Sequence, residues 1–409
     1  MNENRNLYKV ALLVSLACVL QISESLIPHP IPGLRLGLAN MLTLTALVLL
    51  GFRYALEIAV LRTLLSSFIM GTFMSPTFIL SLSGAVVSTV VMGAFFWLSR
   101  SFRGYRLSII GISIVGALTH NVVQLSLAYL LLIRHTGIFA LLPWLCIGGL
   151  VTGWVTGVVA AGVCRKIDGF QNEGVLEALQ SDPVAPAPRD YQAGDSFLHR
   201  LSAETKIVGL FFLALIILVF SNMWLYLWVS TILTVLMVSC GASPGYFFGK
   251  VKRYAFLILM AFFLPLFFNS GTHVLLNIAH LKITAEGLRT GGFLATRILF
   301  LLTFSTLLVR TTSPEEMTLG LGRVLLPLRY VGVSEKRIAT ILSLSWTAFP
   351  FFWDTARATI RQANLKKAGN LRNLIPLLSS LIATLYMETE SKSSFWEDAH
   401  HEQEDPLVS

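Results

Sequence analysis

Charged residues are scarce in this chain. Only 13% of its 409 residues are Asp, Glu, Lys or Arg, whereas a typical soluble chain carries roughly 25%. Hydrophobic residues make up 55%, and the mean hydropathy is +0.70. Repeated apolar runs are long enough to cross the roughly 30 Å hydrocarbon core of a bilayer, and the alternation typical of membrane β-barrels is not visible. The sequence therefore predicts an all-α, polytopic membrane protein.

Residues that would carry chemistry are also few. The 4 cysteines are scattered through apolar runs without a CxxC pair, so neither a disulfide framework nor a metal site is expected. The segment GYFFGK (245–250) has one residue too few between its glycines for a phosphate-binding loop, and no Ser or Thr follows Lys250. Ser/His/Asp and Cys/His sets are not evident. We expect no catalytic site, no metal and no directly bound cofactor.

The net charge is +9, which in a membrane protein is typical of cytoplasmic loops rather than of nucleic-acid binding. If the N-terminus is cytoplasmic, the outer side of the first half receives only Arg35 and Arg134. The cytoplasmic side then receives Arg5, Lys9, Arg53, Arg100, Arg103, Arg106, Arg165 and Lys166. This asymmetry predicts a multi-pass protein of the cytoplasmic membrane with a cytoplasmic N-terminus and no nucleic-acid partner.

Composition divides the chain into four parts. The predicted parts are a six-helix membrane domain (1–167), a Pro- and Ala-rich cytoplasmic linker (168–195), a second membrane domain (196–391) and an acidic, disordered tail (392–409). The expected spans are about 7–27, 36–50, 53–71, 76–99, 107–133 and 138–164 in the first half, and about 204–220, 222–240, 254–270 and 285–309 in the second.

Several polar residues interrupt the apolar spans of the first half, where burial in lipid is costly. Arg62 lies mid-span, Asn40 follows an outer turn, and His120, Asn121 and Gln124 lie near the centre of the fifth span. His120 and Gln124 are four residues apart and share a helix face. These five residues indicate a pocket for an anionic or heteroaromatic, vitamin-like molecule. The alternative is that they form hydrogen bonds between helices and fix the bundle.

Small residues recur at every fourth position of the sixth span. Gly149, Gly153 and Gly157 would allow another helix to approach closely, which predicts a packing role rather than ligand contact.

The first half resembles a known family. The runs PGLRLGLAN (32–40), SLSGA (81–85) and GISIVGALTHNVVQ (111–124) are similar to the Gx transporter family, also called heptaprenyl diphosphate synthase component I. That family resembles the substrate-binding S components of energy-coupling factor (ECF) transporters, which implies a six-helix substrate-binding bundle. Prenyl synthases hold Mg²⁺ and diphosphate with clustered aspartates, whereas Asp168 is the only aspartate in this half.

The second half continues beyond its spans with amphipathic and basic segments. Ser313, Pro314 and Glu316 form a helix-start signature with a capping box. An apolar stripe follows at helical spacing: Met317, Leu321, Val324, Leu325 and Leu328. We expect an apolar helix at about 336–352, a break or kink at Pro350, and a separate basic helix after it. Such helices either lie on the membrane surface or couple the membrane domain to a soluble partner.

This half resembles the transmembrane (T) component of ECF transporters, the EcfT/CbiQ family. The similar runs are SFLHRLSAETKIVGL (196–210), ITAEGLRTGGFLATRIL (283–299), TTSPEE (311–316) and FPFFWDTAR (349–357). The resemblance implies two cytoplasmic helices that dock into two ATP-binding (EcfA-like) subunits, which would use the ATP. It assigns ATPase coupling to the basic residues Arg357, Arg361, Lys366 and Lys367.

Each docking helix of that family carries an Ala-Arg-Gly motif, from which this chain departs. In ANLKKAG (363–369), Lys367 stands at the arginine position, and Lys lacks the planar bidentate fork of Arg. In YMETES (386–391), Glu390 stands there and reverses the charge. The first helix end is therefore the expected contact.

The resemblances together imply the membrane component of an ECF transporter. The first half would bind a small vitamin- or cofactor-like substrate, with flavin- or quinone-related molecules as candidates, and the second would couple it to separate ATPases across the lipid bilayer. One alternative is a membrane accessory subunit of isoprenoid-quinone (heptaprenyl diphosphate) synthesis or of flavin- or quinone-linked electron transfer. Another is a scaffold whose second half has lost coupling, as Glu390 suggests.

Overall fold

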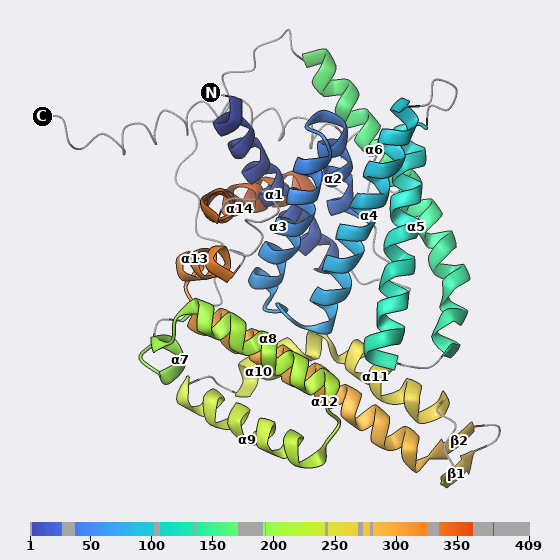
Figure 1. The fold of residues 1–409 in the computed structure, drawn as a ribbon, viewed down its shortest axis with the longest axis vertical. Helices are drawn as coiled ribbons and strands as arrows, with labels where there is room; N and C mark the ends of the chain where they lie inside the picture. Colours follow the sequence, from blue (N-terminus) through green and yellow to red (C-terminus); the bar gives the residue numbers. More distant parts are fainter. Residues whose placement is uncertain are drawn as a thin grey trace, which may run out of the picture.

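The computed structural model describes most of the chain as packed helices (Figure 1). The described residues are 2–26, 37–101, 107–133, 136–170, 191–192, 194–241, 244–268, 273–278, 281–324, 335–362 and 379. The predicted acidic tail and most of the predicted linker lie outside them.

The first half folds into a bundle of six long helices, as the apolar runs predict (Figure 1). They are α1 (Asn2–Leu26), α2 (Leu38–Leu49), α3 (Phe52–Met70), α4 (Pro76–Ser101), α5 (Ile109–Ala128) and α6 (Leu142–Phe170). A π-helical turn, η1 (Tyr129–Ile133), extends α5, and a 3₁₀ turn, η2 (Thr136–Leu141), leads into α6.

Among the residues that the structure describes, the second half is mainly helical and contains one hairpin. Its helices are α7 (Phe197–Arg200), α8 (Ala203–Val219), α9 (Met223–Ser239), α10 (Pro244–Arg253), α11 (Ala255–Phe268), α12 (Ala285–Thr311), α13 (Pro314–Val324) and α14 (Glu335–Gln362). The segment between α11 and α12, which lies outside the expected spans, forms an antiparallel pair, β1 (Val274–Ile278) and β2 (Leu281–Thr284).

The predicted division of α14 at Pro350 is wrong, because the helix runs through this proline without interruption. Proline removes one backbone hydrogen bond from a helix. Tertiary packing on both sides of Pro350 offsets that loss, since Ile341 and Phe352 are each at most 1% exposed. The apolar and basic segments therefore belong to one 28-residue element.

Four helical segments among the described residues are long and apolar enough to cross a membrane: Pro76–Arg100, Ile109–Leu131, Thr136–Lys166 and Ala285–Thr311. Their outward faces, and those of α8 and α9, expose large apolar side chains such as Trp97, Trp154 and Trp224. A water-exposed surface of this kind is unfavourable, whereas lipid covers it without cost. The molecule is a multi-pass membrane protein.

Helix α6 lies very close to α5 at three of its glycines. A Cβ atom added at Gly153 would lie 2.7 Å from Ile114 Cα, and one at Gly157 would lie 2.7 Å from Ile110 Cα. At Gly149 the nearest atom would be Asn121 Nδ2, at 2.9 Å. Any larger side chain at these positions would push the two backbones apart.

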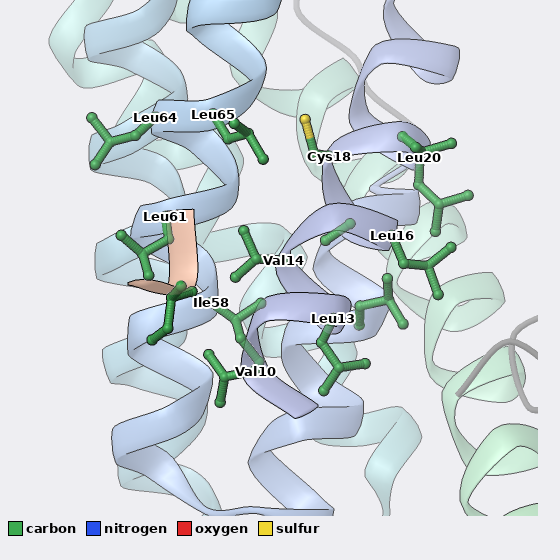
Figure 2. Close-up of a cluster of buried hydrophobic side chains, with 14 of the residues drawn as sticks. Val10, Leu13, Val14, Leu16, Cys18, Leu20, Ile58, Leu61, Leu64 and Leu65 are labelled. Carbon is green, nitrogen blue, oxygen red and sulfur yellow. The ribbon is translucent and has the colours of Figure 1, made fainter. Parts of the chain in front are cut away.

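One hydrophobic core joins the two halves. Helix α1 is buried along most of its length and packs against α3, and Figure 2 shows Val10 and Val14 of α1 between these two helices. The same buried cluster includes Ile341 of α14, as well as residues of α13. The first and second halves are therefore packed as one body rather than as two separately buried units.

Candidate functional site

A small polar cavity lies inside the first-half bundle, with lining residues on all six helices. Its volume is about 40 Å³, which is room for a few water molecules. Its polar lining is formed by Gln21 and Glu24 of α1, Asn40 of α2, Arg62 of α3, Ser81 of α4, Ser113, His120 and Asn121 of α5, and Thr152 and Thr156 of α6.

Arg62 is the cation of this cavity. Its side chain is buried, with 4% of the residue exposed. One terminal nitrogen donates to Gln21 Oε1 at 2.9 Å, and the other donates to Asn40 Oδ1. Both acceptors are amide oxygens, and these two bonds orient the guanidinium.

Glu24 is the carboxylate of the cavity, and it is used to cap a helix. Its two oxygens accept hydrogen bonds from the backbone N–H groups of Gly37 (2.8 Å) and Leu38 (3.2 Å) at the start of α2. A negative charge at a helix N-terminus is stabilising because the first N–H groups have no partner within the helix. Gly37 has φ +74°, a conformation that side chains disfavour. Glu24 therefore fixes how α2 begins beside the cavity.

Residues of α5 form the opposite wall. Asn121 Nδ2 donates to the Leu145 carbonyl at 2.8 Å, which ties α5 to α6. The imidazole of His120 lies against Gly84 of α4, where an added Cβ would be 2.8 Å from the ring. The Cγ of Gln124 also lies near Gly84, at 3.2 Å from such a Cβ.

The structure brings four of the five predicted site residues to this cavity: Asn40, Arg62, His120 and Asn121. Gln124 lies one turn further along α5 and does not line it. The other polar lining residues were not predicted as site residues from the sequence: Gln21, Glu24, Ser81, Ser113, Thr152 and Thr156. The sequence does contain a signal for Gln21 and Glu24. They are three residues apart near the end of an apolar span, which places both polar side chains on one helix face.

The predicted capping box at the start of α13 is confirmed. Ser313 Oγ accepts from the Glu316 N–H, and Glu316 Oε2 accepts from the Ser313 N–H, each at 3.2 Å. In the predicted apolar stripe, Met317 and Leu321 are buried at 3% and 2% exposure. Leu325 and Leu328 lie outside the described residues.

Helix α13 is held against the start of α8. Lys206 Nζ donates to the Thr311 carbonyl at 2.8 Å and to Thr312 Oγ1 at 3.2 Å, just before α13 begins. Arg323 near the end of α13 pairs with Glu204. These contacts fix the angle at which the chain leaves the membrane helix α12.

Helix α14 carries the first part of the predicted coupling segment. Arg357 is exposed and its guanidinium lies 5.3 Å from the ring centre of Trp353, in a cation–π arrangement. Arg361 lies in the last turns of α14. Lys366, Lys367 and Glu390 lie outside the described residues.

The same helix contacts the cavity-bearing half. Arg337, near the start of α14, makes two hydrogen bonds to the Glu57 carboxylate of α3, at 2.9 and 3.1 Å. Further along, Ser345 Oγ donates to the Ala11 carbonyl of α1 at 2.8 Å. Because Arg62 and Glu57 both belong to α3, one helix contacts both the cavity and α14.

Comparison with known proteins divides the chain at the same place. Residues 13–163 match the family of heptaprenyl diphosphate synthase component I, and residues 194–399 match the cobalt transport protein family, CbiQ. The energy-coupling factor transporter transmembrane protein EcfT of Streptococcus thermophilus is 30% identical over 212 residues, covering 49% of this chain and 79% of the relative. EcfT of Listeria innocua is 30% identical over 210 residues, covering 49% and 78%.

The chain belongs to the EcfT/CbiQ family. Its EcfT-like half is joined to a first half that matches a different family. The described residues contain no group of three or more His, Cys, Asp or Glu that could hold a metal ion.

The EcfT-like half also contains a buried arginine that sequence analysis missed. Arg297 lies midway along α12 and is 6% exposed. Its Nε donates to Tyr226 Oη at 2.7 Å and its Nη2 donates to Ser221 Oγ at 2.6 Å. A cation inside a single apolar span should have drawn attention, because such residues seldom face lipid.

Proposed function

We propose that this chain is the membrane part of an ECF-type transporter in which the substrate-binding and coupling units are fused. The single observation that carries the proposal is the position of α14, which belongs to the EcfT-like half and lies against α1 and α3 of the cavity-bearing half. Membership of the EcfT/CbiQ family supports the coupling role. Two separate ATP-binding subunits would hydrolyse ATP.

The mechanism that fits this arrangement is alternating access. Closure of the ATP-binding subunits would displace α13 and α14 from the cytoplasmic side. Helix α14 would pass that displacement to α1 and α3 through the shared core and the Arg337–Glu57 pair. The cavity-bearing half would then reorient across the membrane. The chain itself performs no covalent step, and its N-terminus would be cytoplasmic.

The substrate we propose is a small anionic or heteroaromatic molecule. Arg62 donates to two amide oxygens, and an anionic ligand group would accept from the same guanidinium in a stronger, bidentate bond between opposite charges. At about 40 Å³ the cavity must widen before it admits a vitamin-sized molecule, for which pockets measure about 300 Å³ or more.

Mass spectrometry of small molecules extracted from the purified full-length chain tests the substrate half. We expect one compound to co-purify with the chain. Its amount should fall by about tenfold or more in Arg62→Gln. Arg165→Gln, which changes an exposed arginine on α6, is the matched control. Equal amounts of the compound recovered from the two variants would show that Arg62 is not part of the binding site.

Vesicles that contain the chain and its ATP-binding subunits test the coupling half. Arg357→Glu reverses an exposed charge on α14 and is expected to weaken the subunits' binding about tenfold, whereas Arg165→Glu should leave it unchanged. The proposal fails if the ATP-binding subunits bind both variants as tightly as they bind the unmodified chain.

A second candidate function follows from the match of residues 13–163 to heptaprenyl diphosphate synthase component I. In that case the chain would be an accessory subunit of isoprenoid-quinone synthesis and would need no ATP-binding subunit. Prenyl synthase activity in membranes that rises and falls with the amount of this chain would favour it.

A further inference from the structure

A second, larger cavity lies in the EcfT-like half, between α9 and α12. Its volume is about 550 Å³, which is within the range of small-molecule sites. The wall on α9 includes Met223 and Leu227, and the wall on α12 includes Leu288 and Gly292. It is separate from the polar cavity of the first half, and the two have no lining residue in common.

The inner surface of this groove is aromatic. The ring of Tyr226 packs against Phe293 at 4.8 Å and against Phe300 at 5.6 Å, measured between ring centres. The Tyr226 hydroxyl is bonded to Arg297, and the Thr296 hydroxyl donates to the Gly292 carbonyl at 2.8 Å. Because these two polar groups already have partners, the groove suits an apolar occupant.

One cation stands at the end of the groove nearest the hairpin. Arg289 is exposed, and its guanidinium lies 5.8 Å from the ring centre of Phe293. Helix α12 has 27 residues and is therefore about 40 Å long, about 10 Å longer than the hydrocarbon core. Arg289 is about 6 Å from the start of α12, at the depth where lipid headgroups begin.

The part of the groove beyond Arg289 matches one leaflet. The groove follows α12 from Ala285 to Phe300, which is about 22 Å. Its part from Arg289 to Phe300 is about 16 Å long, and half of the hydrocarbon core is about 15 Å. An occupant with an anionic head at Arg289 and an acyl chain along Gly292 and Phe300 fits both the charge and the length.

We propose that this groove is a binding site for one anionic phospholipid, with its phosphate at Arg289 and an acyl chain between α9 and α12. The site belongs to the EcfT-like half alone and does not depend on the transport function proposed above. The bound lipid would fill the space between α9 and α12.

The test uses the full-length chain in nanodiscs that contain equal amounts of phosphatidylglycerol and phosphatidylcholine, followed by native mass spectrometry. A Cβ added at Gly292 would meet no atom within 4 Å, so Gly292→Trp should fill the groove without disturbing the fold. Gly209→Trp on α8 is the matched control, because that position is equally open and outside the groove.

We expect the unmodified chain and Gly209→Trp to retain one tightly bound phosphatidylglycerol, and Gly292→Trp to lose it. Arg289→Gln should weaken its retention about fivefold and abolish the preference over phosphatidylcholine. If Gly292→Trp elutes as an aggregate, the smaller Gly292→Leu replaces it.

Three results would overturn the proposal. The first is retention of the same lipid by Gly292→Trp or its replacement. The second is equal loss from Gly209→Trp, which would mean that lipid covers the surface without a site. The third is an unchanged headgroup preference in Arg289→Gln, which would contradict the placement of the phosphate.

Discussion

At the scale of single residues, the two buried arginines show how polar groups are accommodated inside this membrane protein. Arg62 and Arg297 are 4% and 6% exposed, and the hydrogen bonds described above link each to neutral oxygen atoms outside its own helix. Burying a cation is costly unless it is hydrogen-bonded. Each arginine therefore depends on helices that are distant in sequence, and each helps to hold those helices together.

Tyr226→Phe tests the environment of Arg297. The substitution removes the acceptor of the Nε hydrogen bond and leaves a buried charged donor without it, which should cost about 1–3 kcal/mol. The measurement is the apparent melting temperature of the purified chain, which should fall. Tyr191→Phe alters an exposed tyrosine and should have no effect; equal melting temperatures for the two variants would contradict the account.

Four residues of the polar cavity were predictable at this scale. Asn40, Arg62, His120 and Asn121 are conspicuous because polar side chains inside apolar spans need partners. The helix cap that Glu24 forms was not predictable. Its role depends on the backbone N–H groups of Gly37 and Leu38, and only the folded chain brings that helix start to α1.

At the scale of elements, local sequence signals predicted the start of a helix more reliably than its end. The capping box at Ser313 was visible because its two partners are three residues apart. The continuity of α14 through Pro350 was not visible, because proline's local cost is offset by tertiary contacts with α13 and with α1, which is far away in sequence. The hairpin before α12 was also not predicted. Its sequence has few of the turn residues that indicate a pair of strands.

Ser313→Ala tests the cap that starts α13. Loss of the side-chain acceptor should cost about 1 kcal/mol locally, so the amide hydrogens of the first turn of α13 should exchange about fivefold faster. Ser313→Asp should preserve slow exchange, because aspartate also caps and adds a favourable charge.

The control is Thr347→Ala, which removes an exposed hydroxyl bonded within its own helix, to the Ser343 carbonyl. Faster exchange in α13 from that variant, or unchanged exchange in Ser313→Ala, would show that the capping box does not set the stability of this turn.

At the scale of the whole molecule, the main feature is the contact between the two halves. Glu57 and Arg337 are separated by 280 residues, and their side chains are 12% and 10% exposed. No pattern in the sequence predicts which surfaces of two membrane domains meet, because lipid-facing and partner-facing apolar residues look alike. The predicted fusion of two units was correct, but their shared core required the structure.

Reversal of one charge at this contact should destabilise the whole chain. Glu57→Arg places two cations together in a nearly buried site and should cost about 3 kcal/mol, whereas the double variant Glu57→Arg with Arg337→Glu restores an opposite pair. The melting temperature of the double variant should lie well above that of the single one. Additive losses instead would mean that the two side chains do not stabilise each other.

The central claim is that this chain works as the membrane part of a transporter powered by separate ATP-binding subunits. The most direct measurement is co-purification of the affinity-tagged full-length chain from its own host in a mild detergent, with the bound proteins identified by mass spectrometry. We predict two ATP-binding subunits, or two copies of one, in a stable complex that Arg357→Glu weakens. Recovery of the intact chain without any ATP-binding protein would contradict the claim.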